Sequence, residues 1–183
     1  MSDQRPTDEL REEHAHVLKK LDALERIVTH PDKRPETTAE LRTLATFFQT
    51  EFWVHFTKEE EALFPEMGKY TLVGKGPLGI MLREHVELRA SNELWQAAVA
   101  GYLSNTDGSE FIAPMKGNAT HFAWMLRDHI NKEDNSLFVM AEQWLKPIEK
   151  QNVARLFIEI EAKESAAVET DIMCFKNTST SRH

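Results

Sequence analysis

Two ten-residue segments of the chain carry residue types that bind metal ions in proteins. The segments are HFTKEEEALF, residues 55–64, and HINKEDNSLF, residues 129–138. Each places a histidine four residues before a glutamate, with a lysine directly before that glutamate. Four residues are about one turn of an α-helix, so the two side chains lie on one face about 6 Å apart along the axis. The candidate ligands in these segments are His55, Glu59, His129 and Glu133.

An ordinary helical surface is the alternative explanation for each pair, because His and Glu four residues apart form a weak solvated contact worth a few tenths of a kcal/mol. The duplication argues against it. Among the eight histidines of the chain, only these two are followed by a glutamate at the fourth position. The repeated pairing indicates that both copies have the same function. Imidazole and carboxylate groups are both common metal ligands, so metal binding is the function that the pairing predicts.

The spacing of apolar residues predicts helices that would position these ligands. A first helix is predicted from Thr7 or Asp8 to Val28. Its apolar stripe has one gap, which His14 fills, whereas His16 is predicted to face outward. A second helix is predicted over residues 38–67, with His55 and Glu59 in the apolar stripe. A buried carboxylate without a partner is costly, and a cation would remove that cost.

Two further long helices are predicted over residues 78–103 and 110–145, followed by a shorter one over 148–168. His85 lies in the apolar stripe of the third helix, and His129 with Glu133 in that of the fourth. No alternating strand pattern and no phosphate-binding glycine motif is found. The sequence therefore predicts a single all-α domain over residues 1–183, an antiparallel up-down four-helix bundle at 8–145 with an additional short C-terminal helix and a flexible tail at 169–183.

Short loops between antiparallel neighbours bring the start of the first and third helices to the same level as the later halves of the second and fourth. Four histidines and two glutamates then meet inside the bundle. Such a set predicts a dinuclear metal site in which Glu59 and Glu133 bridge the two ions. The predicted ligands are His14, His55, Glu59, His85, His129 and Glu133.

The composition excludes several other functions. A formal net charge of −8 argues against nucleic acid or an anionic membrane surface as a partner. No apolar run approaches the ~18 residues of a membrane span, and the first residues lack a hydrophobic signal core. These features predict a cytoplasmic protein. The single cysteine, Cys174, excludes an internal disulfide and a thiolate cluster, so a metal site would use imidazoles and carboxylates.

Over about residues 8–145 the chain resembles the hemerythrin-like, or HHE cation-binding, proteins. The resemblance rests on LREEHAHVLKKLDALE, HFTKEEEALFP, PLGIMLREH and HINKEDNSLF, which keep the order and spacing of that family. It implies a non-heme di-iron centre, two iron ions with an oxo or hydroxo bridge, carried by the six predicted ligands. It also implies a small ligand such as dioxygen, nitric oxide or peroxide, and an unidentified redox or protein partner.

One departure from the oxygen-carrying members of the family is Met81. Those members present a further histidine four residues before the histidine of the third helix, and here Met81 occupies that position, predicted to line the pocket without strong coordination. Their spacing from histidine to carboxylate on the fourth helix is also usually longer. These differences favour sensing, or the handling of oxidative or nitrosative stress, over reversible oxygen carriage. No separate acid, base or nucleophile stands out, so any catalysis would belong to the metal.

Two other functions remain open from the residues alone. A ferritin-like centre uses Glu and His three residues apart, a spacing found at Glu13 and His16. A helical interaction or signalling module, which a metal merely rigidifies, is the other alternative.

Several residues near the motifs are given simpler interpretations. Lys58 and Lys132 are predicted to be solvated, His121 to lie at the edge of a stripe, and Glu51 to hydrogen-bond a ligand histidine. The aromatic residues predicted to pack in or near the core are Phe52, Trp53, Phe56, Trp95, Phe122 and Trp124.

Overall fold

The computed structural model describes residues 5–31, 35–72, 74–105 and 107–179, with side chains described as far as residue 166. Within these ranges the regular structure is entirely helical, and η marks a π-helical segment. The elements in chain order are α1 (Pro6–Thr29), α2 (Pro35–Gln49), α3 (Phe52–Lys58), η1 (Glu59–Leu63), α4 (Phe64–Met67), α5 (Gly76–Ser104), α6 (Ser109–Lys132), η2 (Glu133–Leu137), α7 (Phe138–Trp144) and α8 (Pro147–Ser179).

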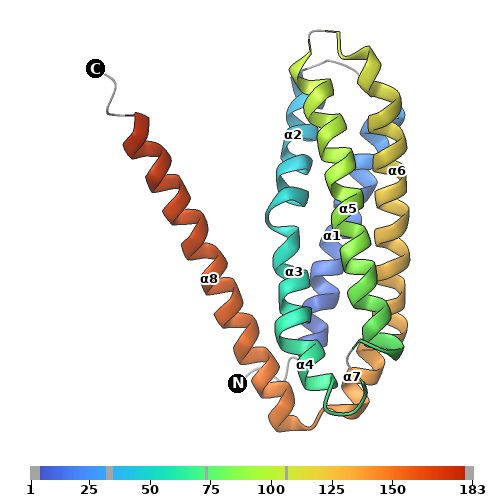
Figure 1. The fold of residues 1–183 in the computed structure, drawn as a ribbon, viewed down its shortest axis with the longest axis vertical. Helices are drawn as coiled ribbons and strands as arrows, with labels where there is room; N and C mark the ends of the chain where they lie inside the picture. Colours follow the sequence, from blue (N-terminus) through green and yellow to red (C-terminus); the bar gives the residue numbers. More distant parts are fainter. Residues whose placement is uncertain (1–4, 32–34, 73, 106, 180–183) are drawn as a thin grey trace.

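The elements from α1 to α7 form long helical rods that lie side by side (Figure 1). α1 is one rod, and α2, α3, η1 and α4 follow one another along the next. α5 packs closely against α6, and α6 packs against α1. α8 follows α7, and it contacts α1, α3 and η1. Its later part extends away from the other rods (Figure 1).

Local sequence explains where several elements begin. α1 starts at Pro6, a residue suited to the first helical position because it has no N–H to satisfy there. The Asp8 carboxylate accepts the Arg5 backbone N–H at 3.2 Å, which closes the first turn. Pro147 begins α8 in the same way. The predicted end of this last helix at residue 168 is corrected, since α8 continues to Ser179 through a stretch without proline or glycine.

The predicted second helix, residues 38–67, is divided in the structure. α2 ends at Gln49 and α3 begins at Phe52. Side chains of α5 support the chain just before this break, where Asn92 Nδ2 donates to the Phe48 carbonyl at 2.9 Å and Gln96 Nε2 donates to the Ala45 carbonyl at 2.8 Å. Side chains of α5 therefore satisfy backbone carbonyls at the end of α2. The local sequence pattern does not reveal this interruption of the helix.

Both copies of the duplicated motif contain a π-helical turn, and each turn begins at the motif glutamate. η1 covers Glu59–Leu63, and η2 covers Glu133–Leu137. A π turn inserts an additional residue into the helix and occurs most often at functional sites. Here it lets the glutamate and the following Leu-Phe all be buried: Glu59, Leu63 and Phe64 in one copy, and their counterparts in the other.

The apolar core consists of two clusters with a polar layer between them. One cluster includes Leu21, Phe48 and Trp95, and the other includes Leu10 and Phe64. Along the sequence, His14, His85 and the two motif glutamates fall between residues of the two clusters, whereas His55 and His129 fall at the edge of the first cluster. The packing of apolar side chains on both sides therefore holds the polar layer inside the protein.

Two aromatic predictions differ in their outcome. Trp95 is fully buried, as predicted, whereas Trp124 is 63% exposed and the prediction that it packs in or near the core was wrong. Trp124 stacks on His121, which is also exposed, with ring centroids 6.2 Å apart. Both lie on the outer face of α6. No described helix combines the length and the apolar character needed to cross a bilayer.

Candidate metal centre

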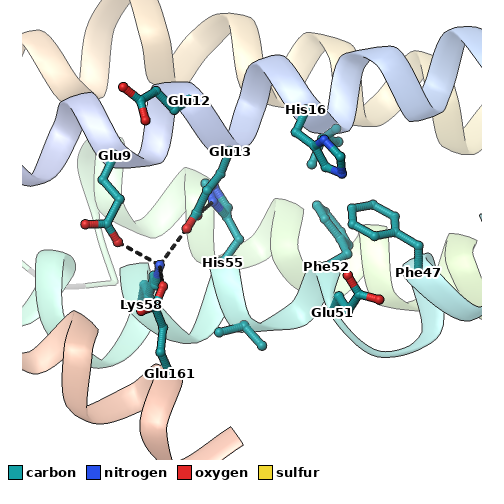
Figure 2. A pocket seen from close by; sticks show the side chains of 12 residues that line it. Glu9, Glu12, Glu13, His16, Phe47, Glu51, Phe52, His55, Lys58 and Glu161 are labelled. Carbon is teal, nitrogen blue, oxygen red and sulfur yellow. Dashed lines mark hydrogen bonds and ion pairs between the residues drawn. The ribbon is translucent and has the colours of Figure 1, made fainter. Parts of the chain in front are cut away.

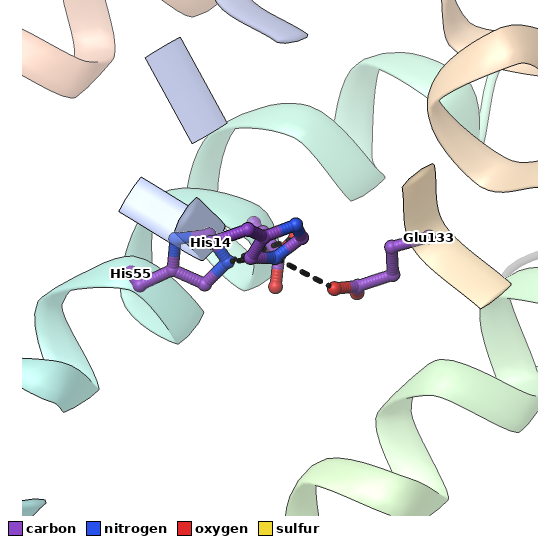
Figure 3. Close-up of side chains that lie close together, drawn as sticks. His14, His55 and Glu133 are labelled. Carbon is purple, nitrogen blue, oxygen red and sulfur yellow. Dashed lines mark hydrogen bonds and ion pairs between the residues drawn. The ribbon is translucent and has the colours of Figure 1, made fainter. Parts of the chain in front are cut away.

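The structure brings the six predicted ligands together in the polar layer. Each is at most 4% exposed, and Glu59, His85 and Glu133 are fully buried. They come from every rod: α1 supplies one histidine, α5 another, and the two motifs supply the remaining pairs. Figure 3 shows three of them, His14, His55 and Glu133, with the His14 ring between the other two side chains.

The four histidines are arranged as two pairs. His14 Nε2 lies 2.9 Å from His55 Nε2, and His85 Nε2 lies 3.1 Å from His129 Nε2. All four Nε2 atoms therefore point toward the interior of the polar layer. We call these pairs the His14–His55 half and the His85–His129 half of the site.

Each motif glutamate reaches both halves. Glu59 Oε1 lies 3.5 Å from His55 Nε2, and its Oε2 lies 3.4 Å from His85 Nε2. Glu133 Oε2 lies 3.2 Å from His14 Nε2, and its Oε1 lies 3.1 Å from His129 Nε2. Potential ligand atoms thus form two overlapping groups, each within 4.8 Å, and both groups contain the same two glutamates.

The glutamate oxygens show why this arrangement suits a cation. Within the described part of the chain, the four oxygens of Glu59 and Glu133 have no hydrogen-bond partner, although all are buried. Burial of a carboxylate costs several kcal/mol unless a positive charge or hydrogen bonds compensate it. Burial raises the pKa of Glu133, but the charge of His129 outweighs that effect and holds the pKa well below its usual range. The site therefore favours positive charge at its centre.

The outer nitrogen of every histidine is held by a carboxylate. Nδ1–H donates to that carboxylate, which leaves the Nε2 lone pair directed at the centre, the tautomer that a metal ligand requires. Two lone pairs facing each other across about 3 Å need a proton or a metal ion between them. The pairs are His14–Asp134 (2.9 Å), His55–Glu13 (2.6 Å), His85–Glu60 (2.6 Å) and His129–Glu84 (2.9 Å).

A basic side chain holds each of these carboxylates in turn. The anchoring pairs are Arg11–Asp134 (3.3 Å), Lys58–Glu13 (2.5 Å), Arg89–Glu60 (2.9 Å) and Lys132–Glu84 (2.5 Å).

These contacts correct three predictions. Lys58 is 1% exposed and not solvated, and Lys132 is only partly exposed because it pairs with Glu84. Glu51 is exposed, and Glu13 takes the place predicted for it on His55.

The sequence contains a pattern that indicates this outer layer of carboxylates and that was not among the predictions. Each motif reads Lys-Glu-acid, at residues 58–60 and 132–134, and each of the other two ligand histidines follows a glutamate, at residues 13–14 and 84–85. The motif lysine anchors the carboxylate of its own histidine. The acid after the motif glutamate binds the histidine of the opposite half. The site therefore has approximate two-fold symmetry.

The pKa values of the histidines follow from the same contacts. Burial lowers the pKa of His14, but Asp134 and Glu133 outweigh it and raise the pKa to about 9. Burial likewise lowers the pKa of His85, while Glu133 and Glu59 raise it to about 11. The carboxylates thus stabilise the protonated rings of His14 and His85 when no metal is present. A metal ion has to displace those protons from the ring nitrogens.

Apolar rings enclose the histidines. Phe56 stacks on the ring of His85, with centroids 3.7 Å apart, and Phe138 stacks on His14 at 5.4 Å. On the His55 side, a surface cleft of about 520 Å³ lies between α1 and α3 (Figure 2). His16 is among the residues that line this cleft and is exposed, as predicted. Glu13 and His16 do not form a ferritin-like pair, because Glu13 binds His55 and Lys58.

The helices and the buried clusters define a helical protein with histidine and glutamate groups able to hold a metal. A family model described as the hemerythrin HHE cation binding domain matches residues 5–141. The chain belongs to this family. Comparison with curated proteins and with solved structures found no match.

Proposed function

We propose that the protein is a non-heme di-iron protein that binds or reacts with a small ligand such as dioxygen, nitric oxide or peroxide, in sensing or in the handling of oxidative or nitrosative stress. The observation that carries this proposal is the pair of shared glutamates. Glu59 and Glu133 each reach both halves of the site, and among the described residues neither carboxylate has a hydrogen-bond partner. Shared carboxylates between two groups of imidazoles are suited to two neighbouring cations.

The proposal includes an architecture and a set of ligands. The scaffold would be an antiparallel up-down four-helix bundle over residues 8–145, and the two irons would be held by His14, His55, Glu59, His85, His129 and Glu133. When bound, the irons supply redox chemistry and open coordination positions for a diatomic or peroxide ligand. The family supports a cation site over residues 5–141, and the donor set of imidazole and carboxylate suits iron.

The chain itself contributes geometry and exclusion of water. The outer carboxylates hold each imidazole with Nε2 directed inward, so the ligands need little reorganisation when metal binds. Phe56 and Phe138, stacked on His85 and His14, restrict water and larger molecules at the site. This enclosure supports a small ligand, the class that the resemblance to the family implies.

Met81 distinguishes this chain from oxygen-carrying relatives. It is 4% exposed and belongs to the apolar cluster next to the polar layer, one turn before His85 on α5. A thioether is a soft ligand and a poor match for ferric iron among nitrogen and oxygen donors. We therefore propose that Met81 leaves an additional position open, which favours reaction over reversible storage.

Metal analysis and spectroscopy of the freshly purified protein test the proposal. We expect about two irons per chain, with the near-ultraviolet absorption of a ferric pair, and spectra that change with azide, dioxygen or nitric oxide. A colourless protein that retains zinc and does not respond to these ligands would instead support a helical interaction module that a metal rigidifies. A protein that takes up a single metal would contradict the bridging role of the glutamates.

A further inference from the structure

The two halves of the site differ in what covers their lysines. Lys132 pairs with Glu84 and with Asp128 on its own helix, at 2.5 and 2.6 Å, and its side chain is 39% exposed. Lys58 occupies the equivalent place in the other half but is 1% exposed. The cover over Lys58 comes from α1 and α8. α8 therefore breaks the approximate symmetry of the site on the side of the His14–His55 half.

Lys58 is bound by three carboxylates. Its Nζ lies 2.7 Å from Glu9, 2.5 Å from Glu13 and 2.6 Å from Glu161 of α8. Figure 2 shows the Lys58 ammonium directed at the carboxylates of α1, with Glu161 approaching from the opposite side. The fully buried Phe157 ring, also on α8, lies 5.4 Å from the ammonium. The lysine therefore binds α8 to the helix that carries Glu13.

A continuous series of polar contacts connects α8 to a predicted metal ligand. Glu161 contacts Lys58 at 2.6 Å, Lys58 contacts Glu13 Oε1 at 2.5 Å, and Glu13 Oε2 contacts His55 Nδ1 at 2.6 Å. The two oxygens of Glu13 thus have different partners, and the Lys58 contact prevents the carboxylate from turning away from His55. Partners of this kind orient a ligating imidazole and raise its basicity.

The charges show why Lys58 needs Glu161. Lys58 is 1% exposed, and the carboxylates of Glu9, Glu13 and Glu161, all within 2.7 Å of its ammonium, compensate for the water that burial removes. Loss of Glu161 would remove one of three carboxylates from a buried ammonium. Lys58 would then be drawn further toward Glu13, and Glu13 would become a weaker acceptor for His55 Nδ1–H.

We propose that Lys58 and Glu161 are positioning residues through which the docking of α8 sets the metal affinity of the His14–His55 half. The coupling is reciprocal, as thermodynamic linkage requires, so metal binding in that half also holds α8 against the bundle. This inference rests on the proposed dinuclear function. It gives α8, which lies beyond the residues 5–141 that match the family, a role in regulating the site.

The test compares Glu161→Gln with Asp128→Asn in the full chain. Both side chains are about half exposed, at 53% and 47%, and each pairs with a motif lysine at 2.6 Å. Anaerobic titration of each metal-free protein with ferrous iron measures the two binding events. We expect Glu161→Gln to weaken one event by about threefold or more. Asp128→Asn should leave both events within about twofold, because the Lys132 side chain is 39% exposed and water can replace the lost carboxylate.

Hydrogen exchange of the α8 backbone over residues 153–161 is the second measurement. In the wild-type protein, iron should slow exchange in this segment. In Lys58→Met, exchange should be faster and iron should no longer slow it, and one binding event should weaken by about tenfold or more. If Lys58→Met does not fold, the half-exposed Glu161→Gln variant still decides the outcome by the same two measurements.

The results separate this inference from the proposed function. The inference alone would be overturned by a wild-type protein that binds two irons with affinities unchanged in Glu161→Gln, and in which iron has no effect on hydrogen exchange of α8. Equal weakening in Glu161→Gln and Asp128→Asn would also overturn it, because the effect would then be a general one of surface charge. A wild-type protein that binds no pair of metals would overturn both.

Discussion

Raising the pH of the metal-free protein is expected to destabilise it, and His14 sets the size of the effect. The pKa of His14 lies at about 9 in the folded protein, above its ordinary value of 6.5. The folded state therefore binds this proton more tightly than the unfolded state does. The resulting stabilisation is fully present below pH 6.5 and is lost as the pH rises through about 9.

The difference between a pKa of 6.5 and one of about 9 corresponds to about 3 kcal/mol for His14, which is only 2% exposed. For a chain of this size that loss lowers Tm by roughly 6–12 °C. His85, whose pKa lies at about 11, extends the loss to higher pH. The carboxylates with lowered pKa values, such as Glu133, are ionised in both states above pH 6.5 and add no slope there.

Thermal unfolding by circular dichroism in the presence of a chelator, between pH 6.5 and 10, measures the effect. His14→Gln should flatten the dependence, whereas His16→Gln at an exposed position should leave it unchanged. Iron-loaded protein should also show little dependence, because the metal replaces the protons. A Tm of the metal-free wild type that stays constant or rises between pH 7 and 9 would refute the reasoning.

Five substitutions, in three comparisons, test the ligands and the pocket. Glu59→Ala and Glu133→Ala should each abolish dinuclear loading, because two cations then repel each other with less negative charge between them, and elemental analysis that still finds both metals would contradict the bridging role. His14→Ala should lower the metal content while His16→Ala should not, and the reverse result would show that the assignment of α1 ligands is wrong. Met81→His should slow the rapid oxidation of the reduced protein in air, followed by stopped-flow absorption, whereas a wild-type protein that releases dioxygen intact after many minutes would point to storage.

The helical class and the family could be predicted from the sequence, because both depend on local periodicity and on ordered motifs. His14 fills the single gap in an apolar stripe, so its burial follows from the 3.6-residue period alone. The convergence of the six candidate ligands could also be predicted, since spacing places each of them on a buried face. Their role as metal ligands remains a prediction for experiment.

Other features depend on partners that are distant along the chain. Lys58 looks like a solvated lysine in its own helix, and its burial requires Glu13 of α1 and Glu161 of α8 to meet it. The break at residues 50–51 between α2 and α3 follows Phe48, whose carbonyl accepts a hydrogen bond from the rod formed by α5. The prediction for Trp124 was wrong because the sequence does not show which face of α6 a neighbouring helix covers.

The sequence by itself determined which residues can bind a cation and that helices present them on buried faces, because both follow from side-chain chemistry and a local period. Only the tertiary structure decided how the carboxylates are divided between two tasks. Glu59 and Glu133 face the histidine Nε2 atoms at the centre and have no hydrogen-bond partner among the described residues. Glu13 and Glu60 instead bind the outer nitrogens of histidines on other helices. That division depends on which helices pack together, and a contact between residues more than twenty positions apart leaves no trace in local periodicity.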